Sequence, residues 1–132
     1  AVIPNHELLT TESRDVLPKE LSYSQAVQAS SISNVMISAV LAHDLKLAGE
    51  MMENDLWHET YRKDLVPHLP EIRSLAKKNG AYATFLSGAG STVLVLVPHS
   101  RLEKLKQLLT ETFVDATVQQ FNVEREGLRV QN

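Results

Sequence analysis

The sequence contains no cysteine, its aromatic content is only 5%, and it has no long apolar run. Without cysteine, neither a disulfide framework nor a thiolate metal site can form. The longest apolar run, at 93–97, is far shorter than the roughly 20 residues that a membrane-spanning helix needs. The net charge of −3 provides no basic surface for nucleic acid. We therefore expect a cytoplasmic protein that binds neither membranes nor nucleic acid.

The 132 residues, of which 43% are hydrophobic, are enough to bury one core, so a single domain over residues 1–132 is expected. Residues 2–9 are predicted to form a strand, which Pro4 restricts to a sheet edge unless the proline stands at a strand end. No methionine precedes this strand. We therefore expect residues 1–9 to belong to, or to lead from, an amino-terminal domain outside these 132 residues.

Three helices are predicted in the first half of the chain. Thr10 or Thr11 can cap a short helix, residues 24–43 form a long one, and Asp44 can cap the next. Small residues of the stretch SSISN, at 30–34, are interpreted as buried for close helix packing, and Trp57 as a core residue. The stripes predicted to be buried are Ala29, Ile32, Met36, Ala39 and Val40 in the long helix, and Leu45, Ala48, Met52 and Leu56 in the next.

The second half alternates extended and helical patterns. A helix is predicted over 70–78, and a second helix is expected to begin at a capping box formed by Ser100 and Glu103. Closing strands are predicted at 116–123 and 127–131, separated by a polar turn. Together with the strands described next, this order indicates an α+β fold in which helices pack on one face of an antiparallel sheet.

Two apolar, β-branched runs surround the compact turn at 87–90 in the segment GAYATFLSGAGSTVLVLVP, Gly80 to Pro98. Glycine accepts positive φ and lets backbone N–H groups face a ligand, so this pair of glycines suits an anion cradle. A tight hairpin that binds no ligand fits the same pattern. The spacing alone leaves both interpretations open.

Several segments resemble the GHMP superfamily of small-metabolite kinases, which is named for galactokinase, homoserine kinase, mevalonate kinase and phosphomevalonate kinase. LSGAGST, at 86–92, is similar to the third motif of that superfamily. ELLTTESRDVLP at 7–18, DLWHETYRKDLVP at 55–67 and the final strands are similar, in the same order, to homoserine kinases. The resemblance covers nearly the whole chain but only the carboxy-terminal half of such an enzyme, and it implies a ferredoxin-like domain.

The resemblance also implies site residues. Arg14 and Arg62 match the two arginines that hold the substrate carboxylate in homoserine kinases, and Thr10 matches a threonine of the same pocket. A guanidinium suits this role because it donates two parallel hydrogen bonds to a carboxylate. Ser87, Gly88, Ala89 and Gly90 match the loop that positions the substrate and the transferred phosphate. No residue of this chain is assigned as a general base or as a metal ligand.

The implied reaction transfers the γ-phosphoryl group of ATP, as its Mg²⁺ complex, to the hydroxyl of L-homoserine, giving O-phospho-L-homoserine for threonine biosynthesis. The serine- and glycine-rich loop that binds ATP in this superfamily does not occur in the sequence. The isolated chain is therefore expected to bind no cofactor and to be inactive. Two departures from the family pattern are Ser91, where proline is usual, and Ala83, where a second glycine is common.

Three alternatives stay open. The chain could be the carboxy-terminal half of another GHMP kinase, a free-standing ferredoxin-like module that binds an amino acid, or a module for self-association, and homodimerisation is undecided in each case. The order HETYR, at 58–62, lacks the second histidine of a zinc-protease helix, so that site is excluded. His58 is interpreted as a helix-surface residue paired with Asp55.

Overall fold

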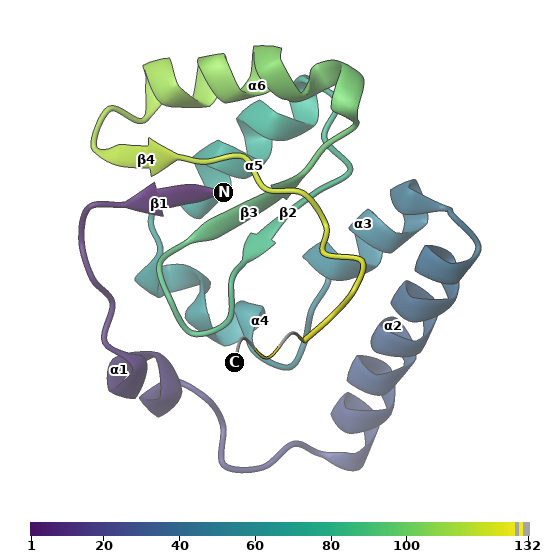
Figure 1. The fold of residues 1–132 in the computed structure, drawn as a ribbon. Coiled ribbons are helices and arrows are strands. Elements are labelled where there is room, and N and C mark those ends of the chain that lie inside the picture. The colour runs from purple at the N-terminus through teal and green to yellow at the C-terminus, as the bar shows by residue number, and fades with distance from the viewer. Residues whose placement is uncertain (129, 131–132) are drawn as a thin grey trace.

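A computed structural model describes residues 1–128 and 130 of the chain. Its helices and strands form an α+β protein (Figure 1). The elements are β1 (Val2–Pro4), α1 (Thr10–Asp15), α2 (Tyr23–Leu41), α3 (Leu45–Glu53), α4 (Glu59–Arg62) with the 3₁₀ turn η1 (Lys63–Leu65), α5 (Leu69–Lys78), β2 (Ala83–Leu86), β3 (Val93–Leu96), α6 (His99–Thr112) and β4 (Ala116–Val118).

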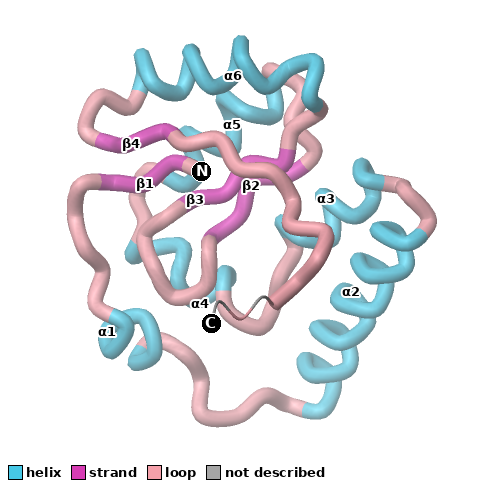
Figure 2. Tube along the Cα trace, in the orientation of Figure 1, coloured by secondary structure: helices cyan, strands magenta, loops and turns pink. Residues whose placement is uncertain are grey.

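The four strands form one antiparallel sheet in the order β2-β3-β1-β4, which is visible in Figure 2. Thr84 pairs with Val95 across the hairpin, and Val2 lies between Val93 and Val118. Helices fill the two long connections, so the chain follows the β-α-β-β-α-β order of a ferredoxin-like fold. The expected fold class is confirmed.

The hydrophobic core lies between one face of the sheet and the helices α5 and α6. Pro70, at the start of α5, suits the first turn of a helix because its missing N–H has no intrahelical partner there. Alternation along the strands turns every second side chain toward these helices. The fully or almost fully buried members of this core are Val2, Val66, Leu69, Ile72, Ala76, Leu86, Val93, Leu105 and Leu109.

Helices α2 and α3 form a hairpin beside β2, at the edge of the sheet (Figure 1). The expected cap of α3 is confirmed, since the Leu47 N–H donates to Asp44 Oδ1 over 3.0 Å. α2 begins with a capping box between Ser22 and Gln25 that the sequence analysis did not identify. Val40 and Leu45, predicted to be buried, are each 38% exposed because they flank the turn between the helices.

Several other local predictions were wrong. Ser30, Ser31 and Asn34 are exposed, so the SSISN stretch does not consist of buried packing residues, and Trp57 is 45% exposed. The predicted caps of α1 and α6 do not form. Leu9 stands at the N-cap of α1 in place of a threonine, and α6 begins after Pro98, which puts Ser100 inside its first turn.

Two predicted strands are shorter than expected. The strand expected at 2–9 ends at Pro4, and β1 is an inner strand, so the proline stands at a strand end rather than on an edge. Of the segment predicted at 116–123, only Ala116–Val118 is a strand. Of 127–131, positions 129 and 131 lie outside the described residues, and 127, 128 and 130 are not in a strand.

The close approach of α3 to β2 depends on Gly49. A Cβ atom at this position would lie 2.2 Å from the Tyr82 carbonyl oxygen, a backbone atom that cannot move aside cheaply. Gly49→Ala is therefore expected to lower the free energy of unfolding by about 1–3 kcal/mol, although alanine normally favours a helix. Urea unfolding measures this change, and Gly90→Ala, where a Cβ atom would lie no closer than 3.9 Å to any atom beyond the neighbouring residues, is the comparison. A stabilising Gly49→Ala would contradict the close approach.

Candidate functional site

Arg62 joins two segments that are distant in sequence. It closes α4 and is only 8% exposed. Its Nε donates to the Ser13 carbonyl oxygen in α1 over 2.9 Å, and its Nη1 donates to the Gly88 carbonyl oxygen over 3.1 Å. Its Nη2 has no hydrogen-bond partner within residues 1–128 and 130. One guanidinium thus ties the TTESR segment to the glycine loop and keeps a donor available.

Asp55 precedes α4, the helix that ends at Arg62, and accepts hydrogen bonds from backbone N–H groups at its start. Its Oδ2 accepts hydrogen bonds from the backbone N–H groups of His58, over 2.8 Å, and of Glu59, over 2.7 Å. His58 Nε2 lies 3.8 Å from the same carboxylate oxygen, so the expected pairing is confirmed. The His58 side chain is 35% exposed, and the residue stands at the N-cap of α4 rather than within the helix.

A buried ion pair fixes α4 against the sheet. Glu59, which is 5% exposed, binds Arg73 Nη2 through Oε1 and accepts the Leu86 N–H through Oε2 over 2.8 Å. Arg73 also donates to the Thr84 carbonyl oxygen, with Nε at 3.0 Å and Nη2 at 2.7 Å. Since Leu86 is the last residue of β2, this network positions the strand that leads into the glycine loop.

The loop at 87–90 is the predicted turn between β2 and β3. It is closed by the Ser87 N–H, which donates to the Thr92 carbonyl oxygen over 2.9 Å, and by the Gly90 N–H, which donates to the Ser87 carbonyl oxygen over 3.3 Å. Gly88 adopts φ = +60°, a conformation that favours glycine. In the described part of the chain, the N–H groups of Gly88 and Ala89 have no hydrogen-bond partner, so both N–H groups are available to bind an anion.

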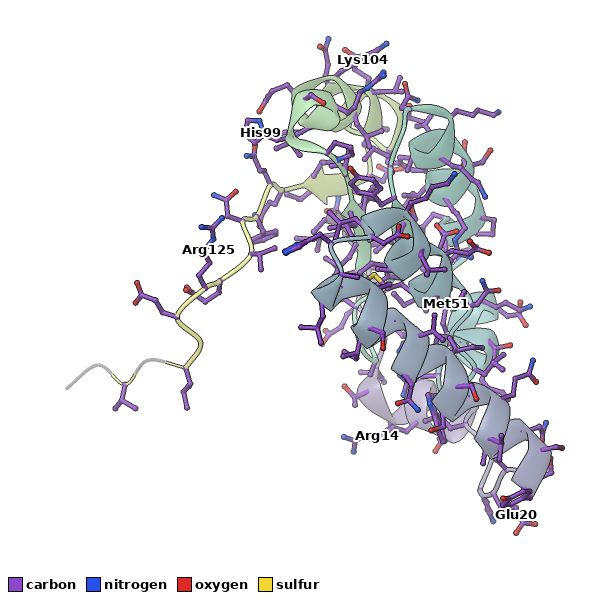
Figure 3. All side chains as sticks on the ribbon, turned by 90° about the vertical axis from the view of Figure 1, so that its right-hand side faces the viewer. Arg14, Glu20, Met51, His99, Lys104 and Arg125 are labelled. Carbon is purple, nitrogen blue, oxygen red and sulfur yellow. The ribbon has the colours of Figure 1, made fainter. Side chains whose placement is uncertain are left out.

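The other predicted binding residues lie on α1, which follows β1. Thr10 and Arg14 are one helical turn apart and both are exposed. Figure 3 shows Arg14 at the surface with its side chain directed away from the body of the protein. The structure therefore brings the α1 backbone at Ser13 to Arg62, whereas the Arg14 and Arg62 guanidinium groups share no partner among the described residues.

Two buried polar atoms, one in α1 and one at the N-cap of α4, have no hydrogen-bond partner within the described residues. One is Ser13 Oγ, in a residue that is fully buried, and the other is Nδ1 of His58. Such atoms are costly unless a ligand, water or another part of the protein satisfies them. Sequence reasoning missed Ser13, although it lies between two residues that were singled out, because its burial arises only when α1 packs on Arg62.

The far end of the glycine loop contacts a pair of histidines. Ser91 Oγ donates to the His6 carbonyl oxygen over 3.2 Å, and His68 Nε2 donates to the Ser91 carbonyl oxygen over 3.3 Å. The two imidazole rings meet edge to face, with 5.7 Å between their centroids. Burial lowers the pKa of His68, the hydrogen bond to Ser91 opposes this effect, and the charge of His6 adds to it.

This lowered pKa predicts how stability depends on pH. The pKa of His68 is lower in the folded state than its ordinary value of 6.5. When the pH falls below 6.5, the unfolded state therefore binds more protons than the folded state. The free energy of unfolding should therefore be at its maximum above pH 6.5 and fall as the pH drops through the pKa of the folded state.

Urea unfolding from about pH 7.5 to about pH 5.5 tests this expectation; burial also lowers the pKa of the Ala1 amino group, so the effect of His68 is read from its substitution. His68→Gln should reduce the pH dependence, and the same change at the exposed His99 is the comparison. An equal pH dependence in His68→Gln and the unmodified chain would contradict the prediction.

Other observations limit the chemistry of the site. Among residues 1–128 and 130, no group of three or more histidine or acidic side chains could hold a metal ion. No helix in the same part of the chain is long and apolar enough to cross a membrane. The His58 side of α4 borders a mainly apolar cavity of about 170 Å³ between α2, α3 and β2, but Arg62 does not line this cavity.

Comparisons with known proteins identify relatives of this chain. A homoserine kinase from Enterococcus faecalis is 55% identical over 130 residues, covering 98% of this chain and 45% of the relative. A homoserine kinase structure from Cytophaga hutchinsonii matches with a TM-score of 0.75 and 25% identity, covering 88% of this chain and 38% of that one.

A solved structure from Listeria monocytogenes matches with a TM-score of 0.73 and 49% identity, covering 89% of this chain and 38% of the other. The chain thus spans less than half the length of the relatives it matches. Residues 36–115 match the family model described as GHMP kinases C terminal, and because this match includes more than half of the sequence, the chain belongs to the GHMP kinase C-terminal family.

Proposed function

We propose that this chain is the substrate-side half of a homoserine kinase, in which it holds L-homoserine while ATP is bound by a part outside these residues. The observation that carries the proposal is the position of Arg62 between α1 and the glycine loop. Its Nη2 makes no hydrogen bond with the described residues and is therefore available to a substrate. Relatives named homoserine kinase, including one 55% identical over 130 residues, support the choice of substrate.

The residues act mainly by positioning. Arg62 Nη2 would bind the substrate carboxylate, and Arg14 would add a second positive charge after its flexible side chain turns inward. The N–H groups of Gly88 and Ala89 would meet the phosphoryl oxygens, where charge builds up in the transition state. Phosphoryl transfer depends chiefly on alignment and charge neutralisation, so no general base has to be found on this chain.

ATP and Mg²⁺ are assigned to no residue of this chain. The described residues contain no acidic cluster that fits a metal ion, and the sequence has no serine- and glycine-rich phosphate loop. When bound elsewhere in the enzyme, the nucleotide supplies the transferred phosphoryl group. The 132-residue chain alone is therefore expected to be inactive. Cytoplasmic localisation goes with this proposal, because its substrates are soluble metabolites.

Release of ADP with different acceptors tests the proposal. The full-length protein that contains this chain should phosphorylate L-homoserine. It should discriminate against mevalonate, which lacks the amino group, and against galactose, which has no carboxylate. The 132-residue chain is assayed beside it and should show no turnover. Preference for mevalonate or a sugar would instead support another GHMP kinase. Tight binding of L-homoserine by the inactive chain alone would favour an amino-acid-binding module.

A further inference from the structure

The outer edge of β2 is covered by side chains. Within the described residues, β2 is the outermost strand at one side of the sheet, so alternate backbone groups on its free edge face no neighbouring strand. The Thr84 N–H donates to Glu53 Oε1 over 2.8 Å, and the Leu86 N–H donates to Glu59 Oε2 over 2.8 Å. Two carboxylates thus hold alternate positions of one strand, and Glu59 holds the position next to the glycine loop.

The same two carboxylates share one positive charge. Arg73 Nη2 binds Glu59 Oε1, and Arg73 Nε lies 3.7 Å from Glu53 Oε1. The side chain of Glu59 is 6% exposed and that of Glu53 is 19% exposed. The two acidic residues therefore make the same kinds of contact with β2 and with Arg73, but they come from different elements. Glu53 ends α3, whereas Glu59 begins α4.

Glu59 stands on the same helix as Arg62. The two residues are one helical turn apart in α4, and both are buried. Glu59 accepts the Leu86 N–H directly before the glycine loop, and Arg62 Nη1 donates to the Gly88 carbonyl oxygen within it. Figure 1 shows α4 beside this loop, which it thus contacts at two points two residues apart. Two attachments to one helix fix the orientation of the backbone between them, whereas a single attachment would let it turn.

We propose that Glu59 is a positioning residue for phosphoryl transfer, which holds the glycine loop so that the Gly88 and Ala89 N–H groups meet the phosphoryl oxygens. This role rests on the proposed function, in which these N–H groups stabilise charge in the transition state. Such donors act through their fixed positions, and a displacement of about 1 Å can cost about 100-fold in rate. Arg73 and Leu86 engage both carboxylate oxygens of Glu59, so it acts through the loop and not on the substrate.

Glu59→Ala in the full-length protein that contains this chain should lower kcat by about 10–100-fold. The KM for L-homoserine should change by about threefold or less, because Arg62 keeps its bonds to Ser13 and Gly88 and its available Nη2. Glu59→Gln keeps an oxygen that can accept the Leu86 N–H, so its kcat should stay within about fivefold of the unmodified protein. Steady-state kinetics of the three proteins measure this split between kcat and KM and the rescue by glutamine.

Glu53→Ala is the matched control. It removes the same kind of bond to a β2 N–H and a contact with Arg73, but two residues further from the loop and from a different helix. It should change kcat by about twofold or less. If Glu59→Ala does not fold by circular dichroism, Glu59→Asp, which keeps the charge but is one methylene shorter, replaces it and should lower kcat more than Glu53→Ala does. Equal effects at positions 53 and 59, or no rescue by Glu59→Gln, would overturn the proposal.

The acceptor assay separates this role from the proposed function. If the unmodified protein prefers mevalonate or a sugar, the proposed function fails, and the same variants are compared with that acceptor, since the role of Glu59 concerns the phosphoryl group. If no acceptor is turned over, amide hydrogen exchange of the 132-residue chain decides. Glu59→Ala should raise the exchange rates of the Leu86 and Ser87 N–H groups by about tenfold or more, whereas Glu53→Ala should act mainly on Thr84. Unchanged exchange at Leu86 and Ser87 would refute the role of Glu59.

Discussion

Replacing Arg73 with methionine is expected to lower the free energy of unfolding by about 3–5 kcal/mol. Arg73 Nη2 binds Glu59, whose side chain is only 6% exposed, and Arg73 also donates two hydrogen bonds to the Thr84 carbonyl oxygen. Without the guanidinium, the Glu59 carboxylate stays buried with no compensating charge, and the carbonyl loses both donors. The loss is larger than that of a surface ion pair because the Glu59 side chain, unlike that of Arg73, is almost fully buried.

Urea unfolding of the 132-residue chain measures this effect. Lys77→Met, on the exposed side of the same helix, is the control and should change the free energy of unfolding by about 0.5 kcal/mol or less. Replacing Glu59 with glutamine as well should recover part of the loss, since position 59 then has no buried charge to leave unpaired, although Glu53, 3.7 Å from Arg73 Nε, still loses its partner. If Arg73→Met and Lys77→Met had equal effects, the ion pair would contribute nothing to stability.

Local sequence signals predicted the parts of the fold that local chemistry determines. The β2–β3 hairpin follows from two β-branched runs around a glycine turn, and the cap at Asp44 follows from a carboxylate before an apolar stripe. The capping box at Ser22 and Gln25 has an equally local pattern and could have been identified. The false one at Ser100 fails because Pro98 already ends the extended segment and α6 begins at the next residue.

The connections that build the candidate site are not local. Glu59, Arg73 and Leu86 come from three elements, and no spacing in the sequence shows that they meet. The resemblance selected Arg62, but its contacts with the Ser13 and Gly88 carbonyl oxygens depend on how α1 packs beside the loop. The same packing buries Ser13 and leaves Arg14 in solvent. Motifs thus selected the segments of the candidate site, while tertiary packing decides which side chain of each segment is buried there and which is exposed.

Arg62→Lys is expected to raise the KM for L-homoserine by about 10–100-fold in the complete gene product, with about a twofold change or less in the KM for ATP. A lysine keeps the charge, but its single ammonium cannot reach both backbone carbonyls and still present a planar donor pair to a carboxylate. An increase in KM of this size corresponds to the free energy lost with one charge-assisted hydrogen bond. Because the substitution also releases α1 from the loop, the free energy of unfolding should fall by about 1–3 kcal/mol.

Steady-state kinetics with each substrate varied in turn, together with urea unfolding, distinguish binding from structure. Arg14→Ala is the matched comparison, since Arg14 is exposed and makes no described hydrogen bond. It should raise the KM for L-homoserine while changing stability by about 0.5 kcal/mol or less. If Arg62→Lys raised both KM values equally, its role would be to hold α1 and the loop together, and the carboxylate would have to be bound elsewhere.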